Sequence, residues 1–223
     1  MYPNEFWSPV VLSLKVSSLA GLIAFILAGY VAWKMTGRRF RGKLVIETLI
    51  MLPMVLPPTV VGFLLLVAFG RRGVIGRLFE QMSGLPIVFT WGAAVIAASV
   101  VAFPLAYQSA KAGFASIDRD LAAAGRSMGA SEWQLLLWVI IPLARRALIT
   151  GFVLAFTRAL GEFGATLMLA GNIPGRTQTL PTAIYMAVES GDMKLAWAWA
   201  GLMVLISFGL LAFFGPRSEQ DEV

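Results

Sequence analysis

The sequence predicts an all-α membrane protein, a polytopic bundle of five to six transmembrane helices. Of its 223 residues, 58% are hydrophobic and 13% are charged, with a mean hydropathy of +0.79. A soluble domain has roughly 45–50% apolar and about 25% charged residues. The apolar residues also gather into runs that reach the roughly 20 residues a helix needs to cross a bilayer. Residues 1–223 are therefore expected to form a single transmembrane domain.

Five apolar runs define the expected spans. The first is too long for a signal-peptide core and is followed by no clear small-residue cleavage site, so it should remain as a span. Around Trp138, the residues before Pro142 favour a further short helix, either a sixth span or an interfacial one. The expected spans are Val10 to Trp33, Thr48 to Phe69, Trp91 to Ala110, Ala144 to Ala170 and Leu195 to Phe214.

The composition excludes several kinds of site. The chain contains no cysteine and no histidine, which removes disulfides, thiolate metal sites and the commonest metal ligand, so we expect no metal site. The net charge of +6 is compatible with nucleic acid, but the basic residues cluster in short loops beside apolar runs. Membrane topology and anionic lipid explain that placement better. We expect membrane lipid, and no nucleic acid, as a partner.

Basic residues also predict the orientation in the plasma (inner) membrane. Five positive charges between Lys34 and Lys43 place the first loop in the cytoplasm, where such residues are enriched. The N-terminus is then outside and, with five spans, the C-terminus is cytoplasmic. Eleven basic residues fall inside (Lys34, Arg38, Arg39, Arg41, Lys43, Lys111, Arg119, Arg126, Arg145, Arg146, Arg217) and six outside (Lys15, Arg71, Arg72, Arg77, Arg176, Lys194). The three outside arginines between residues 71 and 77 fit this orientation least well.

Alanine recurs at every fourth position in the first and third expected spans. The two series are Ala20, Ala24, Ala28 and Ala32, and Ala94, Ala98, Ala102, Ala106 and Ala110. In lipid, small side chains let helix backbones approach closely and gain dispersion contacts. We expect these stripes to be helix contact faces, although alanine is also simply common in membrane helices.

A polar, small-residue segment separates the third and fourth spans. Asp118 can cap a short helix that presents one narrow apolar face, formed by Ile117, Leu121, Ala124 and Met128. Gly129 can end this helix, and Ser131 with Gln134 has the spacing of a capping box that starts the next one. The expected result is a helix, a tight turn and a helix. Spacing alone leaves open a projecting, partner-binding element or an amphipathic helix on the membrane surface.

This segment resembles the EAA loop of bacterial ABC importer permeases, E-A-A-x3-G-x9-I-x-L-P. Ala124, Gly129 and Pro142 match that pattern, whereas Ala123, Gly125, Val139 and Ile141 depart from it. Ala123 replaces the acidic residue, so a salt bridge at that position is impossible. Three further segments resemble the molybdate-type oxyanion permeases: Leu52 to Gly62, Leu160 to Ala165 and Asn172 to Gly175.

The resemblance implies a type I ABC importer permease-like fold and a transport function. In that family the loop is a coupling helix, which docks into a separate ATPase subunit and moves when that subunit closes on ATP. It implies a cytoplasmic coupling segment at about residues 117–142, with Leu121, Ala123, Ala124, Gly125, Arg126, Met128, Gly129 and Pro142 as the coupling residues. The implied partners are ABC ATPase subunits, a second permease copy in a homodimer, and a periplasmic or lipid-anchored oxyanion-binding protein.

The implied cargo is a tetrahedral oxyanion, molybdate or tungstate, moved by alternating access; sulfate or thiosulfate is the alternative within the class. The chain itself is expected to be no enzyme and to hold no cofactor, because ATP and Mg²⁺ would bind the partner. Its nearest approach to a phosphate-binding loop, residues 171–177, is one residue short and has Arg176 in place of the lysine. That segment also follows a membrane span rather than a soluble strand.

Two interrupted regions are candidates for the pathway or its gate. Pro57 and Pro58 remove backbone donors, so the second span should kink or unwind between them and Gly62. In the fourth span, Arg158 and Glu162 are four residues apart, which would put them on one helical face as an ion pair. Gly164 and Thr166 lie close by. The simpler alternatives are a packing kink and a structural ion pair.

The segment from Asn172 to Ile184 is rich in turn residues and is not expected to form one continuous helix. By resemblance it belongs to the external rim, where Asn172, Pro174, Arg176 and Thr177 are candidates. A plain connecting loop is the alternative.

Two other classes of protein compete as interpretations of the whole chain. A secondary transporter would need inverted repeats and a buried ion site, and a scaffold protein would leave the loop pattern unexplained. A measurement of ATP-dependent uptake distinguishes an ABC importer permease from both a secondary transporter and a scaffold protein.

Overall fold

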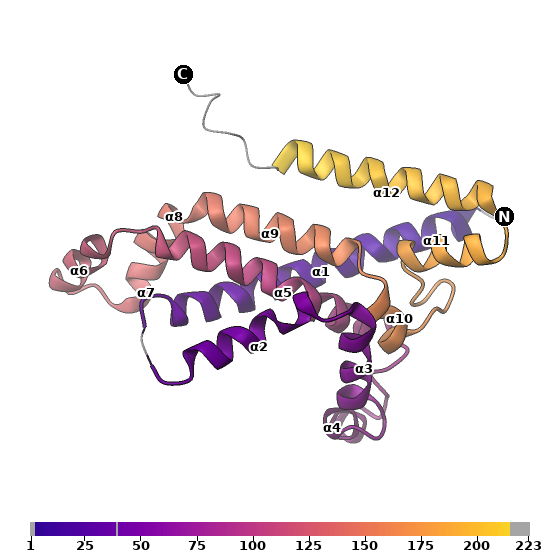
Figure 1. Cartoon of the computed structure of the whole chain (residues 1–223), viewed down its shortest axis with the longest axis horizontal. Helices are drawn as coiled ribbons and strands as arrows, with labels where there is room; N and C mark the ends of the chain where they lie inside the picture. Colours follow the sequence, from indigo (N-terminus) through magenta and orange to yellow (C-terminus); the bar gives the residue numbers. More distant parts are fainter. Residues whose placement is uncertain (1–2, 39, 215–223) are drawn as a thin grey trace.

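The computed structural model describes residues 3–38 and 40–214. Two of the basic residues counted above, Arg39 and Arg217, and the C-terminus that was expected in the cytoplasm lie outside the described residues. Within them the structure is helical, and three helices form its centre (Figure 1): α1 (Pro3–Met35), α5 (Trp91–Ala115) and α9 (Arg145–Leu160). The first of these begins seven residues earlier than the apolar run indicates, because the helix continues through polar residues beyond the bilayer core.

The alanine stripes are the seam between α1 and α5. All nine stripe alanines are almost completely buried, so the prediction of a contact face is confirmed. Beside this seam, the Ser99 hydroxyl donates to the carbonyl of Val95 (2.7 Å). Close approach continues onto α9, where Gly21 of α1 lies against the backbone of Phe156. The seam therefore relies on small side chains, as expected for helices packed in lipid.

The second and fourth runs are not continuous spans. Thr48 to Phe69 divides into α2 (Lys43–Val55) and α3 (Pro58–Phe69), whose axes differ in direction by 115°. Ala144 to Ala170 divides into α9 and α10 (Gly164–Ala170). The first break was expected, because neither proline can donate to the carbonyl four residues earlier. The second break corrects the prediction of one unbroken helix.

Two helices of the structure were not predicted. α4 (Val74–Ser83) follows α3 at the arginine-rich segment, and α11 (Leu180–Glu189) begins near the end of the turn-rich segment Asn172 to Ile184, which is indeed not one continuous helix. The turn-rich part ends at Thr179, because Pro181 in the first turn of α11 is tolerated where its missing N–H has no helical partner. α12 (Met193–Phe214) then runs along the outside of the bundle (Figure 1).

A second apolar cluster ties the C-terminal helices to α1. Val10 packs with Leu180 and Trp199, the Leu180 N–H donates to the Ser13 hydroxyl (2.6 Å), and the Trp199 indole donates to the Phe6 carbonyl (3.1 Å). Among the described residues, three helices are long and apolar enough to cross a membrane, and the number becomes five if each of the two bent pairs counts as one span. The short helix before Pro142 belongs to one of those bent pairs, so it adds no sixth span.

We predict that Ala98→Leu destabilises the bundle. Ala98 has no exposed surface, and inserting a larger side chain into a packed core typically costs about 1–3 kcal/mol. The measurement is thermal unfolding of the purified chain in detergent. Val204→Leu, on the exposed part of α12, is the matched control and should unfold like the wild type; equal stability of the two variants would contradict the assignment of the seam.

Candidate functional site

The polar projection begins with α6 (Arg119–Ser127), which is closed by local hydrogen bonds at both ends. Asp118 caps its start, where the carboxylate accepts from the Asp120 N–H (2.9 Å). At its end the Gly129 N–H donates to the Arg126 carbonyl and the Ala130 N–H donates to the Gly125 carbonyl, both at 3.0 Å. This is a Schellman motif, and Gly129 has the positive φ (+85°) that it requires.

The turn after α6 is rigid because side chains close it as well. The hydroxyl of Ser131 accepts from the Gln134 N–H, while the Gln134 amide oxygen accepts from the Ser131 N–H, so the predicted capping box is confirmed. Arg126 makes two contacts with the Glu132 carboxylate, of 2.7 and 3.3 Å. The hydrogen bond to Glu132 raises the pKa of Arg126 further, so its guanidinium stays charged.

Of the predicted apolar face, Leu121, Ala124 and Met128 are exposed, whereas Ile117, just before α6, is partly buried against the core. Leu121 is 50% exposed and Met128 is 87% exposed, and Ala123 and Ala124 are exposed beside them. Gly125 instead lies against the buried side chain of Leu135. Among the predicted coupling residues, Gly125 therefore packs on the inner side of the projection. Leu121, Ala123, Ala124 and Met128 form its outer surface.

The helix that follows α6 is distorted before Pro142. α7 (Glu132–Leu135) continues as a π-helical turn, η1 (Leu136–Ile140), and then as α8 (Ile141–Leu143). The Ile141 N–H reaches back to the Leu136 carbonyl, which widens the turn just where proline would otherwise clash with the preceding turn. The segment Glu132–Leu143 meets α9 at an angle of 79°. Pro142 thus marks the corner that joins the projection to the fourth apolar run.

Contacts at the base hold the projection against α1. The rings of Trp33 and Trp133 lie 5.4 Å apart, and the Lys34 ammonium lies over the Trp33 ring at 4.2 Å. A cavity of about 600 Å³ opens between the ends of α1 and α5, α6 and the following helix, with charged side chains in its wall from Lys34, Arg38, Asp118, Arg126 and Glu132.

Sequence reasoning missed a charge cluster on the same side of the bundle. Glu47 of α2 accepts from Lys111 (2.7 Å) and from the Tyr107 hydroxyl (3.3 Å), both on α5. Lys43 donates to the carbonyl of Met35, at the end of α1, and to that of Arg38 in the loop that follows, at 3.0 Å each. The cluster therefore ties the start of α2 to the other two helices. The available signal was Glu47, an acidic residue at the very edge of an apolar run and four residues after Lys43.

The two interrupted spans meet each other at their breaks. A Cβ on Gly62 of α3 would lie 2.8 Å from the Ala165 Cα and from the Met168 Cβ, both on α10. A Cβ on Gly164 would lie 3.1 Å from the Pro58 Cβ. The structure therefore brings together the two groups of gate candidates, which the sequence places a hundred residues apart. Thr166, another candidate, is buried in α10.

Glu162 holds the second break together. Its side chain is 1% exposed; one oxygen accepts from Arg158 (2.9 Å) and the other accepts from the Ala165 N–H (2.8 Å) at the start of α10. The predicted ion pair is present, but the two residues do not share a helical face, because α9 ends at Leu160. Glu162 acts in the gap, where its carboxylate replaces helical hydrogen bonds that the break removes. This geometry supports the structural interpretation of the pair.

The rim candidates have different surroundings. Pro174 and Arg176 are exposed. Thr177 is completely buried, and its hydroxyl accepts from the Ile173 N–H (2.9 Å), so it stabilises the turn instead of offering a hydroxyl at the surface. The Asn172 amide oxygen is buried and has no hydrogen-bond partner among the described residues.

A helical membrane bundle that has two broken spans and a rigid, uncovered projection is the architecture of a transport permease. The chain belongs to the family of binding-protein-dependent transport system inner membrane components, whose model matches residues 19–216. It is therefore a transport subunit of the membrane, and in this family the ATPase is a separate subunit.

Named relatives that are 34–55% identical to this chain align with almost all of it. A permease protein of Bacillus subtilis (strain 168), YvgM, provisionally named for molybdenum transport, is 55% identical over 96% of this chain and 94% of its own. The molybdenum transport system permease protein ModB of Escherichia coli (strain K12) is 43% identical over 90% of this chain and 91% of its own. A protein of Chlorokybus atmophyticus, provisionally named as a sulfate transport system permease, is 34% identical over 98% of this chain and 78% of its own.

Solved structures share the fold at low sequence identity. A bacterial alginate ABC transporter in complex with a pentasaccharide-bound periplasmic protein matches with a TM-score of 0.76 at 16% identity, over 99% of this chain and 80% of that one. The MetNI methionine ABC transporter matches with a TM-score of 0.67 at 14% identity, over 95% of this chain and 91% of that one. The predicted type I importer permease fold is confirmed.

We predict that Glu162→Ala destabilises the chain more than Glu162→Gln does. Alanine removes the acceptor of the Ala165 N–H, and an unsatisfied buried donor costs about 1–3 kcal/mol. Glutamine keeps an oxygen in that place and loses only the charge opposite Arg158. Thermal unfolding of the purified variants measures both effects. If the two substitutions proved equally harmful, the ion pair rather than the cap would hold the break.

Proposed function

We propose that this chain is the permease of an ATP-driven importer for molybdate, with tungstate as a second cargo of the same shape and charge. The observation that carries the proposal is the similarity of the whole chain to permeases named for molybdenum transport, at 55% and 43% identity. The relative provisionally named for sulfate lies further away, at 34%. Sulfate is therefore the competing anion that an experiment should include.

We propose that the separate ATPase docks on the exposed face of α6 and binds ATP and Mg²⁺, while this chain carries no cofactor. Leu121, Ala124 and Met128 form a small, exposed apolar surface without a covering element among the described residues. Small residues there permit close backbone approach. The Schellman turn and the capping box keep the shape of α6 fixed, so a displacement of the docked ATPase passes through the corner at Pro142 into α9.

We propose further that two copies of the chain form the pathway, with the N-terminus outside and α6 in the cytoplasm. Alternating access would then open and close the junction of α3 with α10, where Gly62 and Gly164 allow the two broken spans to touch. Exposed Pro174 and Arg176 would belong to the outer rim. A solute-binding protein would deliver the anion at that rim; in the alginate transporter structure a periplasmic protein is present in the complex.

Uptake into proteoliposomes tests the proposed function. The permease, its ATPase and its binding protein are reconstituted with ATP inside, and radioactive molybdate is added outside. We expect uptake that requires all three proteins and ATP, that tungstate inhibits, and that excess sulfate leaves unchanged. Uptake by the permease alone would contradict the proposal in favour of a secondary transporter, and stronger inhibition by sulfate than by tungstate would reassign the cargo.

We predict that Gly129→Val uncouples ATP hydrolysis from uptake, whereas Gly129→Asn does so far less. The left-handed conformation costs an ordinary residue roughly 1–2 kcal/mol, while asparagine adopts it more readily. Among the described residues, no atom outside the adjoining chain lies within 4 Å of the added Cβ, so the effect should come from the backbone and leave membrane insertion intact. The readout is the number of ATP molecules hydrolysed per molybdate imported. An unchanged ratio in the valine variant would count against α6 as the coupling element.

A further inference from the structure

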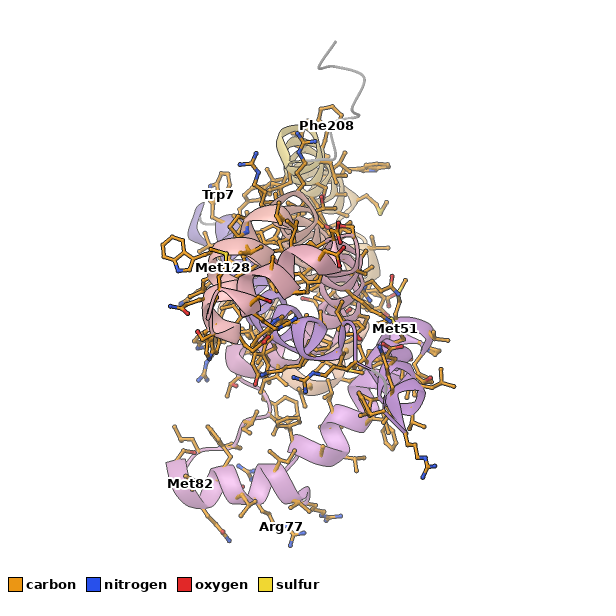
Figure 2. All side chains as sticks on the ribbon, turned by 90° about the vertical axis from the view of Figure 1, so that its left-hand side faces the viewer. Trp7, Met51, Arg77, Met82, Met128 and Phe208 are labelled. Atoms are coloured by element: carbon orange, nitrogen blue, oxygen red, sulfur yellow. The ribbon has the colours of Figure 1, made fainter. Side chains whose placement is uncertain are left out.

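The cavity of about 600 Å³ at the base of the projection has no role in the proposed transport cycle. Its wall is formed by the ends of α1 and α5, by α6 and by the helix that follows α6. Figure 2 looks onto the end of the bundle that carries α6, where Met128 is labelled. Ligand sites in proteins have volumes of roughly 300–1,000 Å³. The cavity is therefore large enough for a small polar ligand.

Two basic side chains in the wall, Lys34 and Arg38, have no anionic partner among the residues that the structure describes. The third basic residue of the wall, Arg126, is paired with Glu132. Both unpaired charges lie within electrostatic reach of the Glu132 carboxylate. They therefore belong to the same charged wall and can act on one ligand together.

The two carboxylates of the wall are already engaged. Glu132 accepts from Arg126 at 2.7 and 3.3 Å, and Asp118 accepts from the Asp120 N–H (2.9 Å) at the start of α6. Three basic residues against two acidic ones leave the wall with one positive charge. Arginine binds phosphate as a planar fork and lysine binds it as a point charge. The unmatched pair thus predicts a ligand with a phosphate-like anionic group.

Aromatic side chains place the cavity at the level of the lipid headgroups. Trp33 ends the first apolar run, and its ring lies 5.4 Å from that of Trp133 and 6.1 Å from that of Tyr30. The Lys34 ammonium lies over the Trp33 ring at 4.2 Å. Tryptophan and tyrosine are enriched at the membrane–water interface, and lysine extends its charge from there into the polar layer. A phosphate at Lys34 would therefore lie where the membrane carries its own phosphates.

An exposed apolar face of α1 leads from this interface into the bilayer. Leu22, Ile26 and Tyr30 follow one another at every fourth position and are 45%, 58% and 51% exposed. Residues at this spacing lie on one side of a helix. A free anion would use only the two basic residues, whereas a phospholipid would use the basic residues and this apolar face together.

We propose that the cavity binds the phosphate of an anionic phospholipid from the leaflet on the α6 side. Lys34 and Arg38 hold the phosphate, and the acyl chains lie along α1. The bound lipid joins the end of α1 to the base of the projection, across the space that lies between them. Because phosphate and molybdate are both tetrahedral oxyanions, a free oxyanion is the competing occupant that the experiment has to distinguish.

Photolabelling of the assembled transporter tests the proposal. The permease, with its ATPase and binding protein, is placed in phosphatidylcholine vesicles that contain a small fraction of phosphatidylglycerol with a diazirine beside its phosphate. After illumination, mass spectrometry of peptides locates the lipid adducts. We expect adducts within residues 33–38 and 114–122, which line the cavity. Unlabelled phosphatidylglycerol should compete for them, whereas molybdate and inorganic phosphate should not.

Lys34→Gln combined with Arg38→Gln should lower the yield of these adducts about 25-fold, since each basic residue near an anionic membrane gains about five-fold in binding. Lys34→Arg combined with Arg38→Lys keeps both charges and should retain most of the label. The matched control, Arg72→Gln with Arg77→Gln, removes the same charge from exposed residues and should leave the yield unchanged. Figure 2 shows Arg77 well away from Met128.

Four results would overturn the proposal: adducts only outside the two cavity segments, equal labelling of the double glutamine variant, displacement of the probe by molybdate or inorganic phosphate, or loss of the label when the ATPase is bound. Displacement would assign the cavity to a free oxyanion, and loss on assembly would assign it to the subunit contact. If the double glutamine variant does not insert, Ala115→Phe replaces it. Ala115 lines the cavity, so phenylalanine should narrow the site and lower the yield without changing the charge. Labelling needs neither ATP nor cargo, so a failure of molybdate uptake would contradict the proposed function and leave the lipid site standing.

Discussion

The structure depends on one constraint: inside a membrane, each backbone N–H and carbonyl needs a partner within the protein or in enclosed water. The three long spans, α1, α5 and α12, meet it largely through their own helical hydrogen bonds, apart from the carbonyls opposite Pro9 and Pro104. The two interrupted spans do not, and their environments differ accordingly. The α9–α10 break is closed by the Glu162 carboxylate, which accepts from Ala165 and from Arg158. The α2–α3 break contacts Gly164 of α10 on one side, while Pro57, Pro58 and Thr59 remain exposed.

The same constraint separates rigid from movable parts. Along the α1–α5 seam, alanines pack backbone against backbone, which leaves little freedom for one helix to shift relative to the other. Between α3 and α10 the contact is made by Gly62 and Gly164 at two helix ends, with no chain continuing straight through. In the proposed mechanism, a displacement that enters at α6 and turns the corner before α9 would therefore meet its least resistance at this junction. Transport of an anion needs one such yielding point in an otherwise stiff bundle.

Much of this could be predicted from the sequence, and the misses have physical reasons. Periodicity found the alanine seam, and local hydrogen-bonding chemistry found the Asp118 cap, the capping box and the turn at Gly129, because each depends on residues a few positions apart. Glu162 was assigned to the same helical face as Arg158 because their four-residue spacing assumes a continuous helix. The spacing alone does not show that the helix ends between them. The Glu47 cluster and the contact of Gly62 with α10 join distant segments, which a single sequence does not reveal. α4 was missed because its alternation of apolar and charged residues was treated only as a count of arginines.

The closed hydrogen bonding of α6 has a consequence for association. A loop that became ordered only on meeting its ATPase would spend much of the interaction free energy on losing its own freedom. In α6 this ordering is already complete, since both ends are capped and Arg126 spans the turn to Glu132. If the ATPase docks on α6 as proposed, little of the interaction free energy is spent on ordering the helix, and most of it remains available to move the spans.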